Sequence, residues 1–262
     1  MLPNVVVIGA QKCGTTALYR QFAQHPECAV CPEVKELHFF VDEGPWPIGS
    51  WRRGVSWYEG MFPSARIVAD VCPSYSAWPV FLGTAERAAA TVPEALIVYL
   101  VRDPIDRIVS HWMHWRDRGY DTRPFDDAVL DPDPGNEYLA GSRYGTQLRR
   151  WLEHYPAERV MVLHQLQLAA GDHGVLWRTL GLSEPAATGS EQRNPSTNLT
   201  EPTVLDRLPG PARRVLPARL RRRPLARPAV TAETERRLRD VLGDDISLLH
   251  SLSDVRLEGW HT

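Results

Sequence analysis

The stretch VVVIGAQKCGTTALYRQF, residues 5–22, decides the fold of this chain. Its first part is a β-branched apolar run that ends at Gly9, and it predicts a buried strand over residues 4–10. Its last part, TTALYRQF, begins a pattern that predicts a helix ending at Pro26. A strand, a glycine-bearing turn and a helix in succession present backbone N–H groups and a helix N-terminus to an anion. The stretch therefore predicts an α/β fold with an anion-binding loop.

Lys12, within this loop, is one of only two lysines among 30 basic residues, and the other is Lys35. The preference for Arg, Ala and Pro indicates a high-GC bacterial genome, against which a retained lysine is informative. An ammonium on a flexible stem can follow a phosphate oxygen through a reaction, whereas a guanidinium fork fixes one planar geometry. Thr15 and Thr16 add hydroxyl donors. An ordinary tight turn explains the glycines but not this set of side chains.

The loop does not match the nucleotide-binding pattern GxxxxGK[ST]. After Gly9 the second glycine is Gly14, and Thr15 stands at the lysine position, while Lys12 precedes Gly14. No acidic strand end suited to holding Mg²⁺ is evident either. The loop therefore predicts binding of a phosphate-like anion without a metal.

Outward from this stretch, strands and helices alternate, which predicts a central parallel sheet with right-handed crossovers, flanked by helices, in a single domain over residues 1–262. Residues 183–228 are loop-rich, and the end of the chain predicts a helix pair with Thr231 as N-cap. The expected strands are 66–71, 95–104 and 159–168, and the expected helices are 85–93, 105–119, 144–156 and 231–255.

Composition bounds the function. A net charge of −2 argues against a nucleic-acid binder, and 43% hydrophobic residues are ample for a core. The N-terminus shows no targeting signal, and the longest apolar run, residues 95–101, is too short to cross a bilayer. We expect a soluble, cytoplasmic protein. Oligomeric state cannot be read from the sequence.

Four cysteines are present, two of them in CAVC, residues 28–31. Their CxxC spacing is compatible with redox chemistry or half a zinc site. A zinc site needs a second pair, and Cys13 and Cys72 are isolated. We therefore expect buried apolar cysteines and no metal site.

A second anion site is indicated after the third apolar strand. Arg102 stands at the end of that strand, and Ser110 lies about two turns into the following helix. An arginine and a hydroxyl so placed suit a second phosphate. The alternative is a local ion pair between Arg102 and Asp103, with Ser110 an indifferent helix residue.

Both motifs resemble those of sulfotransferases that use 3′-phosphoadenosine 5′-phosphosulfate (PAPS), with a P-loop-kinase-like fold. GAQKCGTTAL, residues 9–18, resembles the family's 5′-phosphosulfate loop, and RDPIDRIVSHW, residues 102–112, its 3′-phosphate motif. KELHFF and ADVCPSY, at 35–40 and 69–75, resemble the heparan sulfate branch and its bacterial relatives. The resemblance covers nearly the whole chain and implies these cofactor-binding residues: Gln11, Lys12, Cys13, Gly14, Thr15, Thr16, Ala17, Arg102, Ser110, Tyr144 and Arg193. For Tyr144, a buried structural role is equally plausible.

The resemblance implies in-line transfer of a sulfuryl group from PAPS to a hydroxyl or amine, leaving adenosine 3′,5′-bisphosphate, with Lys12 stabilising the leaving phosphate. Glu36 occupies the position of the family's general base, and His38 could orient the acceptor or share the proton. The alternative for Glu36 is an ion pair with Lys35. The expected acceptor-binding residues are Lys35, His38, Asp70 and Ser74.

One departure is Val71, which stands where heparan-sulfating relatives commonly carry a lysine. Either Lys35 or an arginine substitutes, or the acceptor differs from a polyanionic glycan. The acceptor stays open between a small molecule and a glycan, as does the role of the arginine-rich stretch 213–227. Two other functions compete: a metal-dependent nucleotide or small-molecule kinase, and a non-catalytic nucleotide-binding protein.

Overall fold

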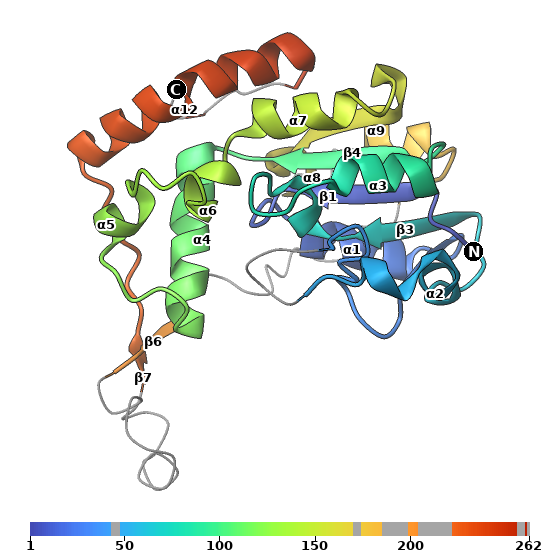
Figure 1. Ribbon diagram of the computed structural model, residues 1–262, viewed down its shortest axis with the longest axis horizontal. Coiled ribbons are helices and arrows are strands. Elements are labelled where there is room, and N and C mark those ends of the chain that lie inside the picture. Colours follow the sequence, from blue (N-terminus) through green and yellow to red (C-terminus); the bar gives the residue numbers. More distant parts are fainter. Residues whose placement is uncertain (43–47, 170–173, 185–198, 204–221, 256–259, 261–262) are drawn as a thin grey trace, which may run out of the picture.

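The structure, a computed structural model, describes residues 1–42, 48–169, 174–184, 199–203, 222–255 and 260. Its centre is a five-stranded parallel sheet in the order β2-β3-β1-β4-β5 (Figure 1). The strands are β1 (Val5–Gly9), β2 (Cys28–Val30), β3 (Ile67–Val71), β4 (Leu96–Val101) and β5 (Val160–His164). This confirms the predicted fold class.

β1 lies in the middle of the sheet and pairs with β3 on one side and β4 on the other. Val5 is in register with Ala69 of β3 and with Leu96 of β4. All five residues of β1 are buried, as expected for a strand covered on both faces. The loop that follows β1 therefore leaves the sheet at the centre of its carboxyl edge, between the segments that follow β3 and β4.

α4 stands beyond the carboxyl ends of the strands, and α7 lies alongside α12 (Figure 1). The short hairpin of β6 and β7 packs against α4. Among the described residues, no helix combines the length and the apolar character needed to cross a membrane. The helices and the hairpin are α1 (Thr15–Gln24), α2 (Val55–Gly60), α3 (Thr84–Thr91), α4 (Pro104–Arg118), α5 (Phe125–Val129), α6 (Glu137–Ala140), α7 (Tyr144–Leu152), α8 (Gln165–Ala169), α9 (Gly174–Thr179), α12 (Ala232–Leu252), the 3₁₀ turns η1 (Trp51–Arg53), η2 (Pro73–Ser76) and η3 (Ala157–Arg159), and the strands β6 (Thr200–Pro202) and β7 (Arg222–Pro224).

The end of the chain departs from the expected helix pair, because α12 is one continuous helix. Thr231 is its N-cap as predicted, and its hydroxyl accepts a hydrogen bond from the Thr234 amide at 3.1 Å. Asp245, within α12, caps α7, since its carboxylate accepts from the amides of Gly145 and Thr146 at 2.8 Å each. α12 thus continues without the expected turn, and Asp245 within it binds the N-terminus of another helix.

Three further differences concern strands. The strand expected over 159–168 ends at His164, because the His164 amide donates to the Gln167 side chain and a short helix follows. The CAV segment at residues 28–30 forms an edge strand that the cysteine pattern did not predict. The loop-rich region contains the β6–β7 hairpin.

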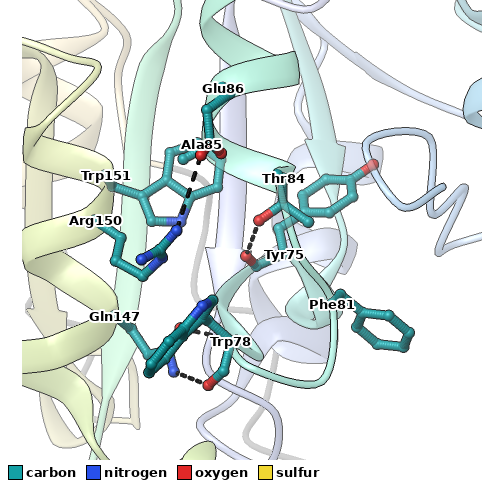
Figure 2. A pocket seen from close by; sticks show the side chains of 10 residues that line it. Tyr75, Trp78, Phe81, Thr84, Ala85, Glu86, Gln147, Arg150 and Trp151 are labelled. Carbon is teal, nitrogen blue, oxygen red and sulfur yellow. Dashed lines mark hydrogen bonds and ion pairs between the residues drawn. The ribbon is translucent and has the colours of Figure 1, made fainter. Parts of the chain in front are cut away.

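The segment that follows β3 is fastened to α7 (Figure 2). The side-chain amide of Gln147 donates to the Trp78 carbonyl at 2.7 Å and accepts from the Trp78 amide at 3.1 Å. The Arg150 guanidinium lies 4.9 Å from the centre of the Trp78 ring, and the Thr84 hydroxyl donates to the Tyr75 carbonyl at 2.9 Å. These contacts hold the segment between η2 and α3 in one conformation.

Candidate active site

The loop between β1 and α1 has a backbone that only a few residues allow. Lys12 has φ 71° and Gly14 has φ 96°, both in the left-handed region. A Cβ atom on Gly9 would lie 1.9 Å from the Ser76 hydroxyl, so the close approach of η2 requires glycine there. The glycines of the motif thus let the chain turn sharply while η2 packs against its base.

The N-terminus of α1 has unpaired donors. Gly14 is the N-cap, no side chain caps the helix, and its first turn holds no acidic residue. Within the described part of the chain, the amides of Gly14, Thr15 and Thr16 donate to no protein acceptor. Three free N–H groups and the positive end of the helix dipole together form an anion site.

These donors face a cleft of about 1280 Å³ at the carboxyl edge of the sheet. The cleft gathers most of the residues singled out in the sequence, from the β1 loop, from α4, and from the segments that precede and follow β3. Those bordering it are Gln11, Lys12, Gly14, Thr15, Thr16, Ala17, Glu36, His38, Ser74, Arg102 and Ser110. Among the described residues, no three His, Cys, Asp or Glu side chains are grouped as metal ligands would be.

Lys12 lies in a strongly positive part of this cleft. Burial, and next the charges of Arg107, Arg118 and Arg102, lower the pKa of Lys12 to about 8. The same surroundings act on His114, since burial and then Lys12 lower its pKa to about 4 and keep the ring neutral at pH 7. A site that disfavours its own protonated lysine is suited to a negatively charged ligand.

Arg107 was not singled out in the sequence, yet it organises the loop. It is buried, with 1% of its surface exposed, and its Nε donates to the Gln11 carbonyl at 3.1 Å. Its Nη1 donates to the Tyr138 carbonyl at 2.8 Å, and its Nη2 lies 2.8 Å from His111 Nδ1. Its spacing of four residues from His111 in one helix was a local signal for that contact. Its other partners, Gln11 and Tyr138, lie far away in the sequence, so no local signal indicated them.

His111 has one ring nitrogen without a partner. Its Nδ1 accepts from Arg107, so Nε2 carries the hydrogen, and this atom is buried with no hydrogen-bond partner in the described part of the chain. The residue borders the cleft. An unsatisfied buried donor at that place fits a ligand acceptor.

Arg102 and Ser110, the residues expected to bind a second phosphate, both border the cleft. Arg102 Nη1 donates to the Lys12 carbonyl at 3.3 Å, and Nη2 lies 3.4 Å from an Asp106 oxygen. Asp103 caps α4 by accepting from the Asp106 amide at 2.8 Å. Arg102 thus connects the backbone of the loop between β1 and α1 to the first turn of α4.

On the β3 side of the cleft lies Glu36, whose carboxylate forms an ion pair with Lys35. This is the contact considered as the structural alternative for Glu36, and it uses one of the two oxygens. The other oxygen lies 3.9 Å from His38 Nε2. Glu36 borders the cleft with about a third of its side chain exposed, whereas Lys35 is not among the residues that line it.

Cys72 contacts a ring nitrogen of His38. Its Sγ lies 3.3 Å from His38 Nδ1, and burial raises the thiol pKa well above its ordinary value. The thiol therefore keeps its proton, and it can donate to Nδ1 in the tautomer whose hydrogen is on Nε2, the nitrogen 3.9 Å from Glu36. Burial also lowers the pKa of His38, so the ring is neutral at pH 7.

Asp70, expected at the acceptor, lies behind the cleft instead. It is 1% exposed, and its carboxylate accepts from the hydroxyls of Tyr58 at 2.7 Å and Tyr75 at 2.8 Å. The Tyr75 oxygen in turn accepts from the Phe39 amide at 2.9 Å. Burial raises the pKa of Asp70 to about 6. Asp70 supports the segment that carries Glu36 rather than facing the cleft.

Other expected contacts differ in a similar way. Cys13 and Tyr144 are buried beneath the loop, with the thiol 3.6 Å from the tyrosine hydroxyl, so neither side chain borders the cleft. Val71 is buried in β3, and Lys35, one of the cations expected to substitute for the missing lysine, pairs with Glu36. Arg193 lies outside the described residues, as does most of the stretch 213–227.

Comparison with known proteins gives a match to one family. The model of the family described as "Sulfotransferase domain" matches residues 2–169. The bifunctional heparan sulfate N-deacetylase/N-sulfotransferase of Drosophila melanogaster is 28% identical over 195 residues, covering 64% of this chain and 18% of that protein. The human bifunctional heparan sulfate N-deacetylase/N-sulfotransferase 3 is 30% identical over 190 residues, covering 64% and 20%.

The chain thus spans about a fifth of the length of these curated relatives. Among solved structures, a sulfotransferase from Alicyclobacillus acidocaldarius superposes with a TM-score of 0.71 at 23% identity, covering 100% of both chains. At that identity the likeness shows a shared fold.

Proposed function

The chain belongs to the sulfotransferase domain family, and from that premise we propose that it transfers a sulfuryl group from PAPS to a hydroxyl or amine of a small-molecule or glycan acceptor. One observation carries the proposal: the free amides of Gly14 to Thr16, at an uncapped helix N-terminus, and Lys12 border the same cleft. When bound, PAPS supplies the sulfuryl group and a bisphosphate leaving group.

Two anion positions fit the two phosphate-bearing ends of this donor. The β1 loop provides amides, hydroxyls and Lys12 for the 5′ end of the donor. Arg102 and Ser110 provide a guanidinium and a hydroxyl for its 3′-phosphate. His111, whose buried Nε2–H has no partner among the described residues, also borders the cleft. A role for Arg193 at the adenosine remains a prediction.

During transfer, Lys12 and the loop amides would stabilise negative charge that grows on the departing phosphate. Their positions are set before any ligand binds, because Arg107 holds the Gln11 carbonyl and α1 fixes the three amides. Preorganised donors avoid the reorganisation that water would require.

Glu36 would accept the proton of the attacking hydroxyl or amine. Lys35 pairs with one oxygen of its carboxylate, and His38 Nε2 lies 3.9 Å from the other. In the tautomer that carries its hydrogen on Nε2, His38 is not itself the base, and its ring lies 3.9 Å from the carboxylate. Tyr75 and Asp70 support the backbone of the same segment.

Calorimetry with adenosine 3′,5′-bisphosphate, alongside ATP–Mg²⁺, tests the donor site. Binding of the bisphosphate in preference to ATP–Mg²⁺ is expected, and Lys12→Ala and Arg102→Ala are expected to weaken it. Preference for ATP–Mg²⁺ would instead favour a kinase.

Transfer of labelled sulfate from PAPS to extracts of the source organism, followed by mass spectrometry, tests catalysis. Glu36→Gln is expected to retain bisphosphate binding and to lower transfer about 100-fold or more. Bisphosphate binding with no transfer to any extract component would indicate a non-catalytic binding protein.

A further inference from the structure

One face of α4 lines the cleft with a row of polar side chains. Arg107, Ser110, His111, His114 and Arg118 all border the cleft, and they recur every three or four residues. This spacing places them along one side of the helix, because 3.6 residues make a turn. The row continues for about two turns beyond Ser110, the residue proposed for the 3′-phosphate, and it ends at Arg118.

Arg118 is a cation whose charge no neighbour neutralises. Among the described residues its guanidinium has no hydrogen-bond or ion-pair partner, and the residue is exposed. The other charged groups of the same turn point elsewhere: Arg116 pairs with Glu201 of β6, and Asp117 pairs with Arg222 of β7. The hairpin therefore occupies the two charges that precede Arg118 and leaves its own guanidinium available to a ligand in the cleft.

Most other arginines of the cleft have partners. Arg102 and Arg227 both pair with Asp106, and Arg107 donates to backbone carbonyls. Arg20, on α1, has no hydrogen-bond or ion-pair partner in the part of the chain that the structure describes. The cleft thus holds two arginines without a protein anion to offset them, one on α1 and one at the end of α4.

His114 locates the end of this row relative to the proposed chemistry. Burial, and then Lys12 and Arg118, lower the pKa of the His114 ring, whereas Glu36 raises it. The ring therefore lies within electrostatic reach of both the cation at the leaving phosphate and the proposed base. Arg118 also ranks ahead of Arg102 among the charges that lower the pKa of Lys12. Because long side chains of a helix lean towards its N-terminus, Arg118 leans back towards His114.

We propose that the guanidinium of Arg118 binds the non-bridging oxygens of the sulfuryl group while the β1 loop binds the adjoining phosphate. The inference rests on the proposed function and adds to it a residue that contacts the reacting group. A planar guanidinium can donate two parallel N–H groups to two oxygens, which fixes the orientation of the sulfur relative to the acceptor. The compact ammonium of Lys12 supplies charge but no such orientation.

A purely structural role for Arg118 makes a different prediction. The residue lies in the last turn of α4, where a cation interacts favourably with the helix dipole. Loss of that interaction would change the free energy of unfolding and would not alter the choice between two ligands. Discrimination between ligands with and without the sulfuryl group therefore separates the two roles.

PAPS and adenosine 3′,5′-bisphosphate are a matched pair of ligands, because they differ by the sulfuryl group and carry similar net charge. Calorimetry without an acceptor measures the Kd of each ligand. Arg118→Ala is expected to weaken PAPS binding about tenfold or more and to leave bisphosphate binding unchanged. Arg118→Lys, which keeps the charge and loses the fork, is expected to give an intermediate Kd for PAPS. Equal weakening of both ligands, or no weakening of PAPS, would overturn the proposal.

Three variants serve as controls. Arg102→Ala is expected to weaken both ligands by the same factor, because both carry the 3′-phosphate. Arg20→Ala is expected to leave the ratio of the two Kd values unchanged, because Arg20 is not among the leading charges that act on Lys12. Arg237→Ala, at an exposed site on α12 that does not border the cleft, is expected to change neither Kd.

The outcomes separate this contact from the function on which it rests. A selective loss of PAPS binding in Arg20→Ala but not in Arg118→Ala would assign the sulfuryl group to α1 and overturn the proposal. An unchanged Kd for PAPS in Arg118→Ala, with a higher KM for the acceptor, would place the guanidinium at the acceptor and overturn it as well. Failure of the wild type to bind the bisphosphate would refute the proposed function itself.

Discussion

Replacing Lys12 with methionine is expected to stabilise the ligand-free protein while abolishing sulfuryl transfer. The pKa of Lys12 falls from its ordinary value of 10.5 to about 8, so the folded state holds this proton less tightly than the unfolded chain does. A shift of that size corresponds to about 3 kcal/mol of destabilisation when the lysine is charged. Methionine has a similar length and no charge. At pH 7, Lys12→Met is therefore expected to raise the free energy of unfolding by up to about 3 kcal/mol.

The pH dependence follows from the direction of the shift. Between pH 8 and 10.5 the unfolded chain binds more protons at Lys12 than the folded protein does, so the stability of the wild type rises with pH across that window. The advantage of Lys12→Met shrinks over the same window. Equilibrium urea unfolding at pH 7 and pH 10 measures both effects.

Lys35→Met is the control, because Lys35 is paired with Glu36 and its loss removes a favourable contact. It is expected to leave the free energy of unfolding unchanged or lower. If Lys12→Met were less stable than the wild type at pH 7, the account of a lysine held at a cost for an anionic ligand would be wrong.

Two further predictions concern residues outside the phosphate loop. Cys72→Ala removes the thiol that contacts His38 Nδ1. It is expected to lower kcat about tenfold and to change the pH profile of kcat, with the KM for PAPS unchanged, while Cys72→Ser restores the rate. Equal rates for the Ala and Ser variants would contradict a role for this contact. Asp245→Ala leaves the Gly145 and Thr146 amides without their acceptor. It is expected to lower the free energy of unfolding by about 1–3 kcal/mol without changing the bisphosphate affinity measured by calorimetry. A free energy of unfolding equal to that of the wild type would show that the cap contributes nothing.

Local pattern was sufficient for the parts of the protein whose partners are near in the sequence. The β-branched run and Gly14 predicted a strand, a turn and a helix, because each depends on neighbouring residues alone. The Thr231 cap was predictable for the same reason. The single continuous helix α12 was not predictable in this way. Asp245 within it accepts a hydrogen bond from a helix about 100 residues away, and no local signal records that partner.

The sequence by itself determined the parallel sheet, the glycine-bearing turn after β1 and the residue types expected to surround a phosphate. Only the tertiary structure decided that Arg107 holds Gln11, that Cys72 contacts His38, and that Asp70 lies behind the cleft instead of in it. The physical reason is distance along the chain. Burial, charge and hydrogen-bond direction depend on groups that meet only when the strands align, whereas the turn is fixed by backbone conformations that a few adjacent residues allow.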